Sequence, residues 1–146
     1  MQERSMKMKI DKKDAQKKLI KLWLIGSLIL FLIFLFETIN TKNYTDLKEP
    51  WLWFMPNIIS PLSLMIGVMI AESTIINKKS RTVDKFFYTL SFTLSFFYIL
   101  LILCTIVLHV FVDMKTIEFF RLSNIWLFPI QGLTVSSLGV FFVKGQ

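Results

Sequence analysis

The stretch FFYTLSFTLSFFYILLILCTIVLHVFV, residues 86–112, contains no Asp, Glu, Lys or Arg. Its 27 residues exceed the roughly 20 that an α-helix needs to cross a hydrocarbon layer about 30 Å thick. A helix that is apolar on all sides lies in a membrane or in the core of a large protein, and a chain of 146 residues is too short for the second case. The stretch therefore predicts a transmembrane helix.

Three further charge-free spans cover residues 22–36, 50–71 and 122–143. The last two are long enough to cross a bilayer, and the first becomes so when Lys18 and Lys21 extend their charged ends to the headgroups. Hydrophobic residues make up 54% of the chain, and its mean hydropathy is +0.59. The sequence therefore predicts an all-α membrane protein, with a basic cytoplasmic segment over 1–18 and a four-helix transmembrane domain over 19–146. The helices are expected at about 19–38, 51–74, 86–112 and 122–143.

Basic residues fall mainly on one side of these helices. Of the 17 Lys and Arg residues, thirteen lie before the first helix, between the second and third, or after the fourth. Because segments rich in Lys and Arg stay in the cytoplasm, both chain ends are expected there, in a multi-pass protein of the bacterial cytoplasmic membrane. This face is expected to bind anionic lipid or a cytoplasmic protein partner, and not nucleic acid, through Lys12, Lys13, Lys17, Lys18, Lys78, Lys79 and Arg81.

Two segments resemble each other, WLWFMPNIISP at 51–61 and WLFPIQG at 126–132. Aligning Trp53 with Trp126 predicts that the chain consists of two similar helical hairpins in the same orientation. The matches are few, so coincidence remains an alternative explanation. The tryptophans themselves are typical of the interface between hydrocarbon and water.

The prolines of these segments indicate where each helix starts. Pro56 and Pro129 are expected within the first turns of their helices, where a missing N–H costs little. Pro61 is expected one turn further in. There it leaves the carbonyl of Asn57 without its usual donor, so that a neighbouring group has to supply one.

Small residues recur at helical spacing on three of the predicted helices. Such residues let helix backbones approach closely, so they predict packing either within one chain or between copies in a homo-oligomer. Both possibilities stay open at this stage. The residues concerned are Ser63, Gly67, Ser91, Ser95, Gly132, Ser136 and Gly139.

Four polar residues of the second and fourth helices fall in one half of the membrane. A buried amide or hydroxyl needs a hydrogen-bond partner, so these side chains predict either a structural layer or a cavity open to a ligand, a lipid headgroup or water. They are Asn57, Ser60, Gln131 and Thr134.

Charged residues at the helix ends suggest two local environments. His109 and Asp113 stand four positions apart, close enough for an ion pair across one helical turn, and the pair is expected to make an interfacial hydrogen bond. Glu72, at the cytoplasmic end of the second helix, could meet Lys78, Lys79 or Arg81. It is expected to be solvated unless an oligomer buries it.

The sequence lacks the patterns of common enzymes. It has one cysteine, Cys104, and one histidine, so neither a disulfide nor a cluster of metal ligands is expected. There is no G-x-S-x-G motif and no phosphate-binding glycine loop, and no carboxylate falls within the four charge-free spans. We therefore expect no enzyme and no cofactor.

Three functions fit these features. The first is a non-enzymatic membrane subunit that forms homo-oligomers and couples a membrane or extracellular event to a cytoplasmic partner. The second is an oligomeric pore or channel. The third is a small transporter component or an immunity-type membrane protein.

A chain made almost wholly of membrane helices, with a basic collar and no soluble domain, resembles the small four-helix membrane subunits of bacterial anti-phage defence systems, such as KwaA of Kiwa. The resemblance covers the whole chain and is architectural, because no diagnostic motif supports it. It implies a multimeric membrane sensor that works with a cytoplasmic effector.

Overall fold

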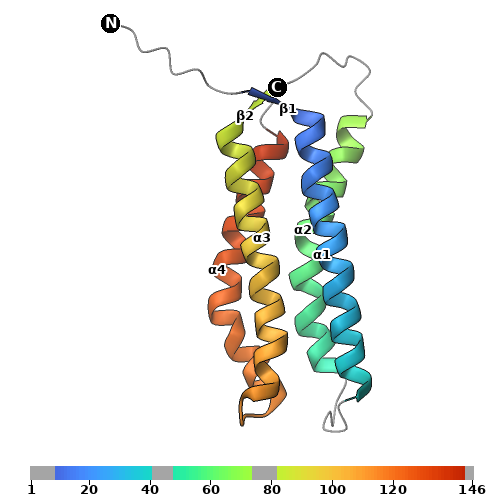
Figure 1. Ribbon diagram of the computed structural model, residues 1–146, viewed down its shortest axis with the longest axis vertical. Helices are drawn as coiled ribbons and strands as arrows, with labels where there is room; N and C mark the ends of the chain where they lie inside the picture. The colour runs from blue at the N-terminus through green and yellow to red at the C-terminus, as the bar shows by residue number, and fades with distance from the viewer. Residues whose placement is uncertain (1–8, 41–47, 74–81, 144–146) are drawn as a thin grey trace, which may run out of the picture.

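The computed structural model of the chain describes residues 9–40, 48–73 and 82–143. Within these residues lie four helices that are long and apolar enough to cross a membrane (Figure 1). The predicted all-α membrane class with four candidate transmembrane helices is thereby confirmed. The helices are α1 (Lys12–Asn40), α2 (Lys48–Ser73), α3 (Lys85–Leu108) and α4 (Thr116–Val143), and a 3₁₀ turn, η1 (His109–Phe111), follows α3.

Two helices begin earlier than the charge-free spans indicate. α1 starts at Lys12 rather than near residue 19, because the side chain of Asp11 accepts a hydrogen bond of 2.9 Å from the N–H of Lys13 and caps the helix. α4 starts at Thr116 rather than near residue 122. A charge-free span therefore marks only the apolar part of each helix.

Because α2 and α4 start early, two prolines lie deeper inside these helices than predicted. Pro56 lies inside α2, which begins at Lys48, and Pro129 lies inside α4. The prediction that both prolines fall in the first turns of their helices is wrong.

The four helices form a square bundle in which each helix packs against two others. α1 contacts α2 and α3, and α4 also contacts α2 and α3. Figure 1 shows successive helices running in opposite directions, so the start of α1 and the end of α4 lie at the same end of the bundle. α2 and α4 are therefore parallel neighbours.

Two short strands join the helix starts at that end, which we call the strand end. β1 (Lys9–Asp11) pairs antiparallel with β2 (Thr82–Asp84), with Ile10 opposite Val83. Asp84 caps α3 by accepting a hydrogen bond of 3.1 Å from the N–H of Phe86. Because the strands lead directly into α1 and α3, their pairing holds these two helix starts together.

Aromatic rings fill the opposite half of the bundle. Phe34 of α1 stacks on Phe54 of α2 with ring centroids 4.5 Å apart, and Trp53 of α2 stacks on Phe120 of α4 at 4.4 Å. The outward faces are apolar too, and Leu28 and Ile125 are among the exposed residues. A soluble bundle covers this surface with polar groups, so the exposed apolar surface agrees with a lipid environment.

Candidate functional site

α3 carries an unusual row of polar residues on its buried face. Ser91, Ser95, Tyr98, Thr105 and η1 residue His109 are all buried, and we call these five residues the polar stripe. The exposed side of the same helix is mainly apolar, with residues such as Leu90, Phe96, Phe97, Leu100 and Val107, and it also carries Thr89 and Thr93. Compared with a helix of a soluble protein, α3 is therefore inverted, with its polar face inside.

Tyr98 forms the centre of this stripe. Its hydroxyl donates to Oδ1 of Asn57 at 2.7 Å, and the amide of Asn57 donates to the carbonyl of Trp53 at 2.7 Å. The same hydroxyl lies 3.3 Å from the carbonyl of Asn57. This is the carbonyl that Pro61 leaves without its usual donor, so Tyr98 of α3 supplies what the proline removes from α2.

The other residues of the predicted polar cavity make no hydrogen bond with Asn57 in the described part of the chain. Thr134 is fully buried and donates to the carbonyl of Ile130 at 2.8 Å, within its own helix. Gln131 donates to the carbonyl of Pro56 at 3.3 Å on a more exposed part of the α2–α4 contact, and Ser60 is exposed. The structure thus divides the four residues between the interior and the outer surface.

The predicted packing residues divide in the same way. Ser91 and Ser95 are inside the bundle, and the hydroxyl of Ser91 donates to the carbonyl of Ser137 on α4 at 3.0 Å. In contrast, Ser63 and Ser136 are exposed. A side chain added at Gly67, Gly132 or Gly139 would meet no atom within 4 Å of its Cβ. These glycines therefore take no part in close helix contacts within the chain.

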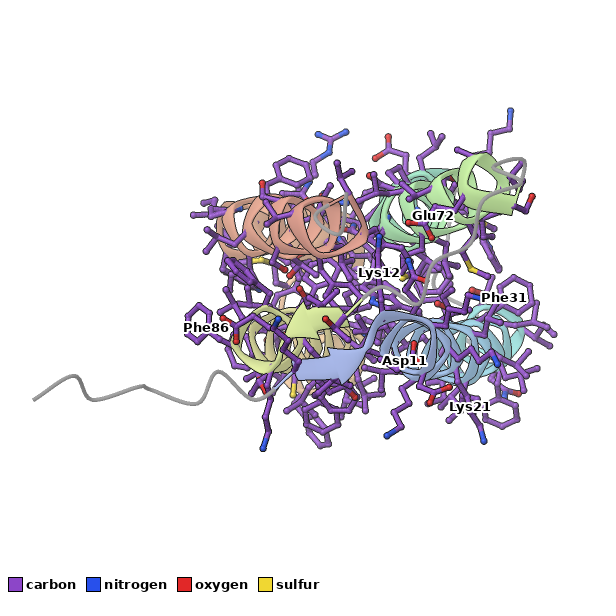
Figure 2. All side chains as sticks on the ribbon, turned by 90° about the horizontal axis from the view of Figure 1, so that it is seen from above. Asp11, Lys12, Lys21, Phe31, Glu72 and Phe86 are labelled. Atoms are coloured by element: carbon purple, nitrogen blue, oxygen red, sulfur yellow. The ribbon has the colours of Figure 1, made fainter. Side chains whose placement is uncertain are left out.

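An ion pair between Lys12 and Glu72 lies at the strand end of the interior. It differs from what was expected of both residues. Lys12 is only 3% exposed, and its Nζ donates to Oε1 of Glu72 at 2.6 Å and to the carbonyl of Phe142 at 2.7 Å. Gln16 donates to the second oxygen of Glu72 at 3.0 Å. Figure 2 shows Lys12 pointing inward between the helices, whereas Lys21 points away.

Lys12 is therefore not a surface charge available to lipid or a partner, and Glu72 is not simply a solvated end residue. The ion pair forms because the cap at Asp11 starts α1 early and turns Lys12 toward the interior. Lys13, Lys17 and Lys18 are exposed as predicted. The remaining basic residues of that prediction, Lys78, Lys79 and Arg81, lie outside the described residues.

A second titratable pair lies at the opposite end. His109 does not pair with the exposed Asp113, since its Nδ1 lies 3.4 Å from Oε2 of Glu37 on α1. That Nδ1 also lies 2.5 Å from the carbonyl of Ile106, which accepts hydrogen bonds only, so the Nδ1 carries the proton. Oε2 of Glu37 has no hydrogen bond within the described part of the chain.

Three polar atoms of α1 and α3 are buried without a partner among the described residues. Among residues 9–40, 48–73 and 82–143, no group hydrogen-bonds to Nε1 of Trp23 or to the hydroxyls of Ser27 and Ser95. The Trp23 ring lies 6.1 Å from the Tyr98 ring, between centroids. Buried polar groups are normally paired, so these atoms point to an uncommon interior.

Sequence reasoning missed Tyr98, Thr105, Trp23 and Ser27 as interior polar groups. A signal was present, because Ser91, Ser95, Tyr98, Thr105 and His109 follow a spacing of three, four or seven residues, which places them on one helical face. Tyrosine and threonine were not recognised there because both also occur on lipid-facing surfaces.

A comparison of the chain with protein families, curated proteins and solved structures finds no match. Within the described residues, no three His, Cys, Asp or Glu side chains lie close enough to hold a metal ion. The function therefore has to be argued from the geometry of this chain alone.

We predict that Tyr98→Phe lowers the melting temperature of the detergent-solubilised protein. The change leaves the ring in place but removes the donor to Asn57, and an unpaired buried acceptor costs about 1–3 kcal/mol. Tyr88→Phe is the matched control, because it makes the same change on the same helix and the Tyr88 hydroxyl has no hydrogen bond among the described residues. Equal melting temperatures for the two variants would contradict the assignment.

We also predict that Lys12→Met destabilises the protein more than Lys13→Met. The first change removes the ammonium group that donates to the partly buried Glu72, whereas Lys13 is exposed on the same helix. Adding Glu72→Met to Lys12→Met should recover part of the loss, because it removes the carboxylate that has lost this ammonium group. If thermal unfolding shows the two single variants to be alike, Lys12 is not buried.

Proposed function

We propose that the chain is a non-enzymatic subunit of the bacterial cytoplasmic membrane that forms homo-oligomers and passes a membrane or extracellular event to a cytoplasmic partner. The observation that carries the proposal is an unused small-residue surface along the two parallel helices α2 and α4. We call this surface the α2/α4 outer face, and it comprises Ser60, Ser63, Gly67, Gly132, Ser136 and Gly139.

The α2/α4 outer face suits the approach of another helix. Open space around the Cβ positions of Gly67 and Gly132 lets a second backbone come close, which is the usual basis of helix association in membranes. The hydroxyls of Ser60, Ser63 and Ser136 make no hydrogen bond within the described residues. A helix from another copy offers these hydroxyls partners that lipid tails cannot provide.

The strand end is the proposed site of communication with the cytoplasm. β1 pairs with β2, which leads into α3, and Lys12 at the start of α1 contacts the ends of α2 and α4. One short segment is thus linked to all four helices. A relative shift of the helices therefore changes the surroundings of residues 9–16. The exposed Lys13, Lys17 and Lys18 lie beside this segment and suit an acidic partner, with each charge worth about 1 kcal/mol near an anionic surface.

The orientation proposed is the one in which both chain ends and the strand end face the cytoplasm, since thirteen of the 17 basic residues belong to that side. The two hairpins are proposed to be similar units. KIDKK at 9–13 and TVDKF at 82–86 each supply a strand residue, a capping Asp and a Lys, and they stand 73 positions apart, as do Trp53 and Trp126.

A role as the membrane sensor of an anti-phage defence system remains our proposal and rests on architecture alone. An oligomeric pore lined by Asn57 and Thr134 has less support, because both side chains are buried and hydrogen-bonded inside one chain. A transporter or immunity role has no specific observation in its favour.

Leucine at Gly67 and Gly132 tests the proposal. A Cβ added at either glycine has no atom within 4 Å among the described residues, so the monomer should fold normally while the added bulk holds copies apart. We predict a shift to smaller particle mass in detergent, measured by light scattering during gel filtration. Thr93→Leu with Cys104→Leu is the matched control, since both residues are exposed on α3.

An unchanged mass for the Gly67→Leu, Gly132→Leu variant would remove the α2/α4 outer face from the proposal. The same shift in the α3 control would show that added bulk acts nonspecifically. Circular dichroism of each variant reports whether the helical content is kept.

A further inference from the structure

We infer that α1 binds a phospholipid with a primary ammonium headgroup, as in phosphatidylethanolamine, in a groove at the end of the bundle opposite the strand end. This site goes beyond the proposed assembly and signalling, because α1 is not part of the α2/α4 outer face. It requires neither a second copy nor a protein partner.

The groove lies on one face of α1, close to the end of the helix. Its volume is about 500 Å³, within the roughly 300–1,000 Å³ of pockets that hold small ligands. Figure 1 shows that this part of α1 lies at the end of the bundle away from the two strands. The described residues that line the groove are Leu32, Ile33, Phe36, Glu37 and Asn40.

The groove changes from apolar to polar along the helix, as a phospholipid does along its length. Its first part is apolar, and there the side chains of Leu32 and Phe36 are open to the outside. Glu37 and Asn40 follow directly after the charge-free span 22–36 has ended. The apolar part therefore lies at the depth of the acyl chains, and the polar part lies at the depth of the headgroups.

The carboxylate of Glu37 lacks hydrogen-bond donors in the described part of the chain. His109 faces its Oε2 at 3.4 Å, but the proton on Nδ1 of His109 is shared with the carbonyl of Ile106 at 2.5 Å. Oε2 is buried without a hydrogen bond, and Oε1 forms none with any described residue. A carboxylate at the edge of hydrocarbon needs donors, so they have to come from outside these residues.

An ammonium headgroup suits this carboxylate. It carries a positive charge and three N–H donors, and its hydrogen bond to a carboxylate is charge-assisted. The trimethylammonium group of phosphatidylcholine has the charge but no N–H, so it cannot form that bond. The exposed amide of Asn40 lies on the same face of α1 as Glu37 and can donate to the phosphate that follows the ammonium group in the lipid.

Other ligands suit the groove less well. A divalent cation such as Ca²⁺ prefers several oxygen ligands, whereas no three His, Cys, Asp or Glu side chains come together in the described parts of the chain. A free amine pairs with Glu37 but leaves the apolar part of the groove unfilled. A phospholipid supplies both the ammonium group and the acyl chain.

The test is native mass spectrometry of the purified full chain, titrated in detergent with phosphatidylethanolamine or phosphatidylcholine of the same acyl chains. Both lipids are zwitterionic, so the basic residues of the strand end do not favour either one. We expect one phosphatidylethanolamine to bind roughly tenfold more tightly than phosphatidylcholine, as one charge-assisted hydrogen bond provides. This comparison needs no variant, and equal binding of the two lipids would overturn the inference.

Glu37→Gln assigns the preference to the carboxylate. It should reduce the preference to about threefold or less, because a hydrogen bond to a neutral acceptor is about half as strong. Glu118→Gln is the matched control, since it neutralises an exposed carboxylate at the same end of the bundle and should leave the preference unchanged. An undiminished preference in Glu37→Gln would place the lipid elsewhere and contradict the inference.

Phe36→Ala tests the apolar part of the groove. It should weaken the binding of both lipids equally and keep the preference between them, whereas Phe128→Ala on α4 should change neither. Displacement of the lipid by ethanolamine alone would show that the groove holds a free amine. Loss of the lipid from every dimer in the spectra would assign the groove to a second copy. Either result would overturn the lipid assignment.

Discussion

Hydrocarbon offers no hydrogen bonds, and this constraint organises the whole bundle. Backbone groups are satisfied within helices, and polar side chains turn inward to find partners in neighbouring helices. Tyr98 shows the consequence most clearly, because its hydroxyl donates to Oδ1 of Asn57 and lies 3.3 Å from the carbonyl that Pro61 leaves free, so the two acceptors share its single proton. The apolar residues are then left to fill the remaining core and to cover the outside.

The two ends of the bundle satisfy their polar and charged side chains in different ways, because at the ends water can also supply hydrogen bonds. At the strand end, Lys12 is buried but fully engaged with Glu72 and the last turn of α4, while short strands hold α1 to α3. At the other end, Glu37 and His109 face each other between helices. The central α2/α4 outer face, in contrast, leaves its small residues without partners, which is why assembly is proposed there and communication at the strand end.

The four helices and their membrane character were predictable, because charge-free spans of sufficient length admit few other structures. The first residues of the helices were not predictable from these spans, since a cap such as Asp11 can extend a helix through charged residues. The Lys12–Glu72 pair joins positions 60 residues apart, and no local pattern links them. The two sets of small residues looked alike in sequence. Only the packing separates Ser91 and Ser95, which are inside, from Gly67 and Gly132, which are outside.

The inverted polarity of α3 is the central claim, and spin labelling along residues 90–108 in lipid nanodiscs tests it most directly. Collision with dissolved oxygen, which concentrates in the hydrocarbon, is measured at each labelled position. The structure predicts high oxygen accessibility at Leu90, Phe97, Leu100 and Val107, and low accessibility at Ser91, Ser95, Tyr98 and Thr105. If the oxygen accessibility along α3 is instead highest at the serine positions, the account is contradicted.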